Sequence, residues 1–279
     1  MTITEAIITA IVEGLTEFLP VSSTGHMIIT EHLLGTATTE TERSFTNLFT
    51  VVIQLGAILA VVVLYHKKFF QFNRWQFYAK LVVGVIPALI LGYLFADKID
   101  ELLFNPTTVA IALLAGGIIL LVIDNIFKVH TIEKEENLSF GKSFIIGCWQ
   151  VISMVPGVSR SAATIIGGMQ QKLTRNLAAE FSFFLAVPTM FAATAYSLFL
   201  KDWQGDNGAT HNGIELVTAT KENTIAFIVG NIVAFVVAIL AIRFFIGFLK
   251  KHGFRIFGIY RIIVGIVLLI LIFTGVLGK

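Results

Sequence analysis

The chain has 279 residues, of which 56% are hydrophobic and 14% are charged, and its mean hydropathy is +0.85. Ordinary soluble domains carry about 25% charged residues. The composition therefore excludes a soluble globular protein and predicts a polytopic membrane protein. The net charge of +2 favours no nucleic-acid partner. A single cysteine, Cys148, excludes a disulfide within the chain.

The N-terminal segment 3–34 is apolar but is interrupted by polar and helix-breaking residues. The interruption reads Glu13-Gly-Leu-Thr-Glu17-Phe-Leu-Pro20-Val-Ser22-Ser23-Thr24-Gly25-His26. Neither side of it is long enough to cross about 30 Å of hydrocarbon, which takes roughly 20 residues. Broken segments are tolerated at membrane depth only where they are buried in protein or line a wet cavity. We therefore expect a re-entrant helix pair that returns to its own side.

A second segment of the same kind covers 143–170 and is broken at Pro156-Gly157-Val158-Ser159-Arg160-Ser161. Continuous apolar runs of spanning length make up much of the remaining chain. We predict six crossings near 48–66, 77–96, 107–127, 177–200, 224–247 and 257–277. The sequence thus predicts an all-α polytopic membrane protein with two re-entrant helix pairs.

The second half of the chain echoes the first. Besides the two broken segments, Val83-Gly-Val-Ile-Pro-Ala88 resembles Val229-Gly-Asn-Ile-Val-Ala234, and Gly117-Ile-Ile-Leu-Leu121 resembles Gly265-Ile-Val-Leu-Leu269. We predict one membrane domain, 1–279, built from halves of about 1–130 and 140–279. A re-entrant pair plus three crossings is an odd number, so the halves would form an inverted-topology repeat, an arrangement that places sites near the midplane.

The placement of positive charge orients this topology. Of the 20 Lys and Arg residues, the predicted crossings put 12 on one side and five on the other, with Arg160, Arg243 and Arg261 in or beside membrane segments. Because positive loops stay in the cytoplasm, both termini and the polar loop 201–223 are expected outside. The first broken segment then enters from outside and the second from the cytoplasm.

Glu13 and Glu17 are four residues apart and therefore lie on one face of a helix. Two carboxylates at this spacing repel, and in a low-dielectric setting they persist only with a shared proton, a cation or a nearby arginine. The alternative is a solvated face of an interfacial helix. Binding of a divalent cation or acid–base chemistry explains the pair better.

Three hydroxyl residues, Ser22, Ser23 and Thr24, follow the first break. A hydroxyl can cap the helix that begins there, and the positive end of the helix dipole favours a phosphate. One cap needs one hydroxyl, so three in succession indicate a functional role for at least one serine. His26 lies about one turn from these serines. Acid–base chemistry or a phosphate contact competes there with an ordinary structural hydrogen bond.

Arg160 follows the second break, and a guanidinium inside a membrane segment needs an anion. Its fork of N–H donors suits phosphate oxygens. The alternative is a structural ion pair with Glu13 or Glu17. Further donors surround it at another helix start: Ser159, Ser161 and Thr164. Gln54, inside a predicted crossing, is assigned to packing.

The two broken segments resemble the signatures of a known family, the undecaprenyl pyrophosphate phosphatases of the bacterial cell envelope, also called bacitracin-resistance proteins. The run from Glu13 to His26 resembles the first signature throughout, and the run from Pro156 to Ser161 resembles the second. The similarity continues through Val52-Ile-Gln-Leu-Gly-Ala-Ile-Leu-Ala-Val61, and length and hydropathy agree over the whole chain.

This resemblance implies a multi-pass hydrolase of the bacterial inner membrane. It would convert undecaprenyl diphosphate to undecaprenyl phosphate and inorganic phosphate, recycle the lipid carrier for cell-wall synthesis and confer resistance to bacitracin. The expected partners are the polyprenyl diphosphate substrate and membrane lipids, with a second copy of the chain as a further candidate. A divalent cation, Mg²⁺ or Ca²⁺, is implied. By position, the catalytic or substrate-contacting residues are Glu13, Glu17, Ser23, His26 and Arg160.

In the mechanism that we expect, Arg160 and the helix N-termini hold the phosphates, and Glu13 and Glu17 hold the cation. Ser23 or a water, aided by His26, attacks the terminal phosphorus. Further phosphate contacts are expected from Ser22, Thr24, Ser159, Ser161 and Thr164. Because the segment with the glutamates enters from outside, the site is expected to open outward.

The main rival is a polyprenyl-phosphate flippase or transporter with the same phosphate site, since inverted repeats with broken helices are a transporter architecture. A transporter would not require a hydroxyl and a histidine beside the anion. A type-2 phosphatidic acid phosphatase is disfavoured because no histidine followed shortly by Asp stands near Arg160. A non-catalytic structural protein is the least favoured, given the cost of buried charge.

Overall fold

The computed structural model of the chain describes residues 1–35, 39–95, 98–99 and 105–276. Within these ranges, six helices are long and apolar enough to cross a membrane. They are α3 (Glu40–Leu64), α5 (Trp75–Leu94), α7 (Pro106–Ile126), α10 (Arg175–Phe199), α12 (Lys221–His252) and α13 (Arg255–Phe273). The prediction of an all-α polytopic membrane protein is confirmed. The last residues of the predicted crossings 77–96 and 257–277 lie outside the described residues.

Two of these helices are longer than the apolar runs that predicted them. α3 begins at Glu40 because Thr39 Oγ1 accepts a hydrogen bond from the Glu42 N–H, and the Glu42 carboxylate accepts one from the Thr39 N–H. α12 continues to His252, so that its last turn carries cations, which the helix dipole favours at a C-terminus. Hydropathy locates the centre of a crossing, whereas caps and charges set its ends.

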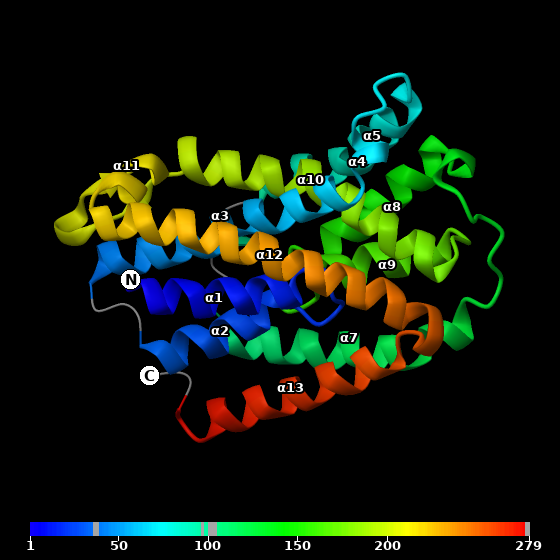
Figure 1. Ribbon diagram of the computed structural model, residues 1–279. Coiled ribbons are helices and arrows are strands. Elements are labelled where there is room, and N and C mark those ends of the chain that lie inside the picture. The colour runs from blue at the N-terminus through cyan, green and yellow to red at the C-terminus, as the bar shows by residue number, and fades with distance from the viewer. Residues whose placement is uncertain (36–38, 96–97, 100–104, 277–279) are drawn as a thin grey trace.

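The two broken segments are each a pair of shorter helices. The first pair is α1 (Ile3–Thr16) and α2 (Ser23–Leu34), and the second is α8 (Phe140–Ile152) and α9 (Arg160–Gln170). α1 ends at Thr16, one turn before the proline that the sequence suggested as its end. In Figure 1, α1 and α2 lie towards the end of the molecule that carries the N-terminus and α11 (Gly213–Thr218), and α8 and α9 lie towards the opposite end.

The two helices of one broken segment are offset in sequence from those of the other by the same number of residues. The separation in sequence between Ile3 and Phe140, where α1 and α8 start, equals the separation between Ser23 and Arg160, where α2 and α9 start. The next helices of the two halves, α3 and α10, are both 25 residues long, and a threonine caps each of them. The offset is what a repeat of two halves predicts, and it identifies equivalent positions in the two broken segments.

Each broken pair packs on a crossing from the other half of the chain: α1 contacts α12, and α8 contacts α5. α3 lies against both α10 and α12, and α7 lies against α13. Small residues allow these close approaches. A Cβ on Gly147 of α8 would overlap the carbonyl oxygen of Gly84 in α5. Helices of the two halves therefore pack directly against one another.

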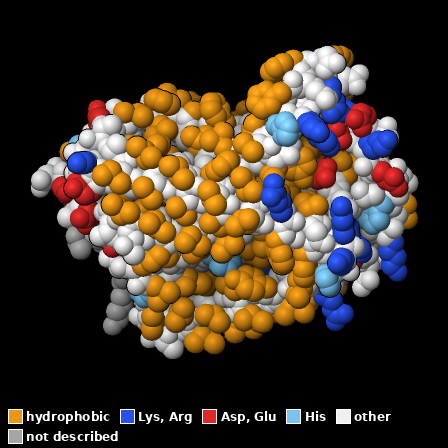
Figure 2. Space-filling model, in the orientation of Figure 1, with side chains coloured by type: hydrophobic (Ala, Val, Ile, Leu, Met, Phe, Trp, Pro, Cys, Tyr) orange, Lys and Arg blue, Asp and Glu red, His pale blue; other side chains and the backbone are white. Residues whose placement is uncertain are grey.

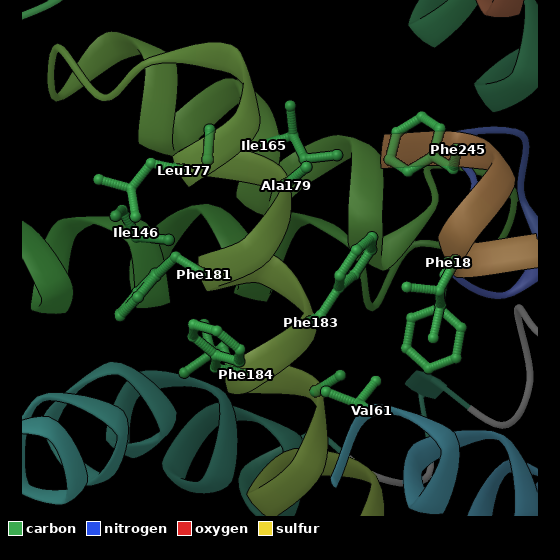
Figure 3. Packing of buried hydrophobic residues seen from close by; sticks show 14 of the residues in the cluster. Phe18, Val61, Ile146, Ile165, Leu177, Ala179, Phe181, Phe183, Phe184 and Phe245 are labelled. Atoms are coloured by element: carbon green, nitrogen blue, oxygen red, sulfur yellow. The ribbon is translucent and has the colours of Figure 1, made fainter. Parts of the chain in front are cut away.

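Aromatic residues of α10 form the centre of the core (Figure 3). Phe183 meets Phe18 edge to face, with ring centroids 5.3 Å apart, and packs against Phe245 of α12 at 6.0 Å. Phe18 directly follows Glu17, so this packing anchors the first broken segment to the core. Large apolar rings in well-defined packing fix the backbone on which the neighbouring polar side chains stand.

Short elements occupy the two polar ends. Near α11, β1 (Trp203–Gln204) pairs antiparallel with β2 (Thr210–His211), and η2 (Asp206–Gly208) lies between them. The opposite end carries α4 (His66–Phe69) and η1 (Glu135–Asn137). Figure 2 shows that most of the visible Lys and Arg side chains gather at this second end, with a broad apolar band between the ends.

Glu135 binds cations at this basic end. It accepts hydrogen bonds from Lys68 at 3.1 Å and from Arg74 at 2.7 Å. Burial alone would raise the pKa of the Glu135 carboxyl, but these two hydrogen-bonded cations more than offset it and hold the pKa below its ordinary value. The loop after α7 is thereby tied to the helices that precede it.

Candidate active site

Each broken segment turns at a serine whose backbone lies in the left-handed region. Ser22 has φ 69° and Ser159 has φ 75°, which are uncommon values for residues with a Cβ. Both serines cap the following helix, because their Oγ atoms accept hydrogen bonds from the N–H groups of Gly25 and Ala162. We call the segments between the paired helices, 17–22 and 153–159, the first and the second hinge. Both hinges end in a serine with the same backbone conformation and the same capping pattern.

Arg261 of α13 holds both hinges in place. Its fully buried guanidinium donates hydrogen bonds to the carbonyl oxygen of Pro20 in the first hinge, at 3.3 Å, and to those of Gly157 and Val158 in the second, at 2.8 and 2.9 Å. Two further hydrogen bonds reach carbonyl oxygens of α7. Buried carbonyl groups at helix breaks need such donors. Sequence reasoning assigned no role to Arg261, because a residue at the edge of a crossing gives no sign that it reaches two distant turns.

A polar cavity of about 200 Å³ lies where the two hinges meet. The first turns of α2 and α9 form part of its wall. Free N–H groups and the positive end of the dipole make a helix N-terminus favourable for an anion. Two such termini at one cavity favour a ligand with more than one anionic group. Six of the predicted site residues line it: Glu17, Ser22, Ser23, Thr24, Ser159 and Arg160.

Hydrogen bonds connect the side chains of Ser23, Glu17 and Arg160 in this wall. The Ser23 hydroxyl donates a hydrogen bond to Glu17 Oε2 at 2.7 Å. The other carboxylate oxygen, Oε1, accepts from Nε and Nη2 of Arg160 at 3.3 and 3.2 Å. Glu17 comes from the first broken segment and Arg160 from the second, so the two hinges meet at a carboxylate. The carboxylate lies where it can accept the proton of Ser23, and its other oxygen is bound by the arginine.

Arg160 is held from a second side. Its Nη1 donates to the carbonyl oxygen of Ser182 at 2.8 Å and to the Ser182 Oγ at 3.3 Å, and its guanidinium lies 5.8 Å from the centroid of the Phe18 ring. The structural ion pair that the sequence offered as an alternative thus exists, with Glu17. Arg160 nevertheless borders the cavity, and at least one of its five N–H donors remains uncommitted.

Glu13 is not among the residues that line the cavity, although it lies next to Glu17. Its carboxyl is buried beside that of Glu17, and its Oε1 atom has no hydrogen-bond partner within the described residues. A buried oxygen without a partner is uncommon in a native structure. The pair Glu13 and Glu17 therefore has a vacant acceptor, as expected for residues that take up a proton or a cation.

His26 points away from the cavity, towards α13. A carbonyl oxygen can only accept, so the contact of 2.8 Å between His26 Nδ1 and the Ser22 carbonyl requires that Nδ1 carries the proton. Nε2 of the neutral ring then accepts from the Tyr260 hydroxyl at 2.7 Å, and the two rings are stacked. This places His26 as a support for the backbone of Ser22. No sequence pattern pointed to Tyr260.

Ser161 and Thr164, which were also predicted to contact phosphate, do not line the cavity. The Ser161 hydroxyl donates to the Leu19 carbonyl at 2.8 Å, which ties the second hinge to the first. Thr164 Oγ1 lies 2.6 Å from the Ser182 Oγ, beneath Arg160. Their positions make them supports of the hinge and of Arg160.

The cavity wall contains four polar residues that the predicted site omitted: Gln54, Gln150, Ser153 and Thr189. Gln54 was assigned to packing from its place inside a crossing, and the structure places it in the cavity wall. A usable signal was present for Gln150, because the offset that relates the two broken segments places it at the position of Glu13. Thr189 and Gln54 are related in the same way, since they stand equally far from the starts of α10 and α3.

No group of three or more His, Cys, Asp or Glu side chains suited to a metal ion occurs in the part of the chain that the structure describes. A cation held by Glu13 and Glu17 would therefore need neutral oxygen ligands or oxygens of the substrate. Hard divalent cations accept amide and carbonyl oxygens, water and phosphate alongside carboxylates. The donor set around Glu17 fits this kind of site.

Fold and site together define a multi-pass membrane protein with a cavity lined by polar residues between two broken helix pairs. The chain belongs to the family whose model is described as bacitracin resistance protein BacA, which matches residues 6–267. This confirms the family resemblance found in the two broken segments.

Several relatives that match this chain over nearly their whole length share the same name. A protein of Flavobacterium psychrophilum named undecaprenyl-diphosphatase is 56% identical over 270 residues, covering 96% of this chain and 95% of that protein. Proteins with the same name from Flavobacterium johnsoniae and Porphyromonas gingivalis are 52% and 49% identical, over 96% and 99% of this chain and the same shares of their own lengths.

Proposed function

We propose that this protein is a membrane phosphatase that hydrolyses undecaprenyl diphosphate to undecaprenyl phosphate and inorganic phosphate. The observation that carries the proposal is the chain of Ser23, Glu17 and Arg160 at a cavity bordered by two helix N-termini. The named activity of relatives that match nearly the whole chain supports it. Recycling of the lipid carrier for cell-wall synthesis, and resistance to bacitracin, follow from this reaction.

The positive ends of α2 and α9 and the free N–H of Arg160 bind the diphosphate. Transfer of a phosphoryl group depends mainly on positioning and on stabilising the charge of the transferred group. Thr24, Ser22 and Ser159 line the cavity and supply hydroxyl or backbone donors near the same place. The prenyl chain stays in the membrane, and only the head group enters between the crossings.

Ser23 is the nucleophile in this proposal. Its Oγ attacks the terminal phosphorus while its proton passes to Glu17 Oε2, the atom to which it already donates. The bond between that phosphorus and the bridging oxygen breaks, and undecaprenyl phosphate leaves. Glu17 passes the Ser23 proton to a phosphate oxygen of the departing lipid phosphate. It then takes a proton from the water that attacks the phosphoserine and gives it to the Ser23 oxygen, as the bond between that oxygen and phosphorus breaks and inorganic phosphate is released. Transport of a lipid would not need this hydroxyl–carboxylate pair, so the flippase alternative is less favoured.

Glu13 and Glu17 would hold a divalent cation, Mg²⁺ or Ca²⁺. Such a cation supplies charge neutralisation for the diphosphate oxygens when it is bound. The vacant Oε1 atom of Glu13 and its position beside Glu17 support this assignment. Measurement of phosphate release from undecaprenyl diphosphate by the purified protein, with and without a chelator, tests both the activity and the cation.

Replacement of Ser23 by alanine is expected to slow phosphate release by about a hundredfold, because a water in the vacated space can still lose its proton to Glu17. Ser153→Ala is the matched control. Ser153 lines the same cavity, but its hydroxyl donates to the Gln150 carbonyl within its own helix, so release should stay within a few-fold of the wild type. A Ser23→Ala protein with the wild-type rate would assign the attack to water.

The protein is a multi-pass membrane protein, and we place it in the bacterial inner membrane with its active site open to the outside. The end with fewer Lys and Arg, which carries α11, then faces outward. Thr189, Met190 and Ala193 line the cavity from the half of α10 that leads to β1 and α11. That half of the cavity wall lies towards the outer end.

Cysteine labelling tests this orientation. In a Cys148→Ser background, which removes the native exposed thiol, Thr210→Cys in β2 is expected to react with a membrane-impermeant maleimide in intact cells. Lys251→Cys, exposed near the end of α12, should react only after the membrane is opened. The reverse pattern of labelling would contradict the proposed topology.

A further inference from the structure

Gln150 of α8 carries a buried acceptor atom that no protein group satisfies within the described residues. Its side chain is 2% exposed and lines the cavity. Thr189 Oγ1 donates its proton to the Leu185 carbonyl at 2.8 Å, so the same oxygen must accept from Gln150 Nε2, which lies 3.0 Å away. This fixes the orientation of the amide. Gln150 Oε1 is then left buried, without a hydrogen-bond partner among the described residues.

Gln150 in the second half of the chain and Glu13 in the first half occupy equivalent positions. Gln150 stands as far from the start of α8 at Phe140 as Glu13 stands from the start of α1 at Ile3. Both also end in a buried oxygen, Oε1, without a partner. Equivalent positions of the two broken helices thus present one carboxylate oxygen and one amide oxygen that each need a donor or a cation.

The charges near the cavity decide which ligand suits the amide oxygen. Glu17 lines the cavity and Glu13 lies beside it, whereas Arg160 is the cation among the residues lining the wall. An amide oxygen carries partial negative charge, so it repels the oxygen of a phosphate. It is, by contrast, a good ligand for a hard cation such as Mg²⁺, Mn²⁺ or Ca²⁺.

We propose that Gln150 Oε1 is a ligand of the divalent cation that Glu13 and Glu17 hold, so that both halves of the chain build the cation site. This inference rests on the proposed function and names a neutral ligand from the second half. The hydrogen bond to Thr189 orients the amide, as partners beyond the ligands do in metal sites. A neutral third ligand also accounts for the lack of a third acidic residue near the pair within the described residues.

Titration of the detergent-purified protein with Mn²⁺ alone tests the inference, with free Mn²⁺ followed by electron paramagnetic resonance. Gln150→Leu keeps the volume of the side chain but removes the amide oxygen. It should raise the Kd for Mn²⁺ by about tenfold or more, because removing even a group that only hydrogen-bonds to a metal ligand weakens metal binding by at least that much. Gln150→Glu adds a ligand charge and should lower the Kd by several-fold. These opposite shifts separate ligation from a loss of folding, which gel filtration checks in each variant.

Asn176→Leu is the matched control, because Asn176 Oδ1 is also a buried amide oxygen without a partner among the described residues but does not line the cavity. Its Kd for Mn²⁺ should equal that of the wild type. Equal Kd values for all four proteins, or an equal loss in Asn176→Leu and Gln150→Leu, would overturn the inference. So would a wild-type protein that binds no Mn²⁺. Phosphate release by the same preparations reports on the proposed function independently of the titration.

Discussion

Replacement of Arg160 by alanine is expected to abolish most phosphate release, with a fall of about a thousandfold or more, the loss typical of an arginine that stabilises a transferred phosphoryl group. The guanidinium binds the Glu17 carboxylate and Ser182 in the resting protein and keeps a donor for the substrate. Its removal therefore takes away both the proposed phosphate contact and the partner of the Glu17 carboxylate. The rate should be measured with saturating substrate and divalent cation.

Arg160→Ala should also lower stability, by about 3–5 kcal/mol, because it leaves the buried Glu17 carboxylate without its partner. The double variant Glu17→Gln, Arg160→Ala removes this unpaired charge. We expect it to regain much of the melting temperature and none of the activity. An Arg160→Ala protein that keeps the wild-type rate at a temperature where it is still folded would mean that Arg160 acts only by holding the fold.

The two halves of the chain contribute different chemistry from equivalent positions. At the start of α2 stands Ser23, a hydroxyl, and at the equivalent start of α9 stands Arg160, a cation. Glu13 in α1 has Gln150 as its counterpart in α8. The two broken helix pairs thus bring two N-termini that favour an anion to one cavity, and the equivalent positions carry different side chains: a hydroxyl and a cation, a carboxyl and an amide.

Most of the fold could be predicted from the sequence because apolar runs of spanning length are a strong signal. The two breaks were equally visible, since proline and hydroxyl residues stand in otherwise apolar segments. The short elements β1, β2 and η2 in the 201–223 loop could not be predicted, because pairing over two residues leaves no pattern in the sequence. The start of α3 at Glu40 was missed because its cap lies in a polar stretch.

The candidate site was predictable only for residues that lie beside the breaks. Glu17, Ser23 and Arg160 are polar residues in apolar surroundings, and the structure brings them together. Gln150 was not identified because an amide in an apolar helix is more often a packing residue, and only a residue-level alignment of the two halves marks it. His26 was located correctly near Ser22, yet the direction of its ring depends on Tyr260, 234 residues away.

Arg261 illustrates why contacts between distant turns escape sequence reasoning. It donates hydrogen bonds to five carbonyl oxygens, which belong to both hinges and to α7. Both hinge serines hold left-handed backbone conformations, and such conformations persist only where the surroundings fix them. We infer that the two hinges keep their shape because one side chain from α13 satisfies the carbonyl groups on either side.

Replacement of Arg261 by methionine should therefore destabilise the protein by about 5 kcal/mol and lower its melting temperature in detergent by about 10–20 °C, since each buried carbonyl without a donor costs about 1–3 kcal/mol and some will find water. Arg243→Met is the matched control, because Arg243 is an exposed arginine of α12 and its loss should change stability by less than about 0.5 kcal/mol. Arg261→Lys keeps the charge without the fork of donors and should fall between the two. Equal melting temperatures for Arg261→Met and Arg243→Met would show that the hinges hold without this arginine.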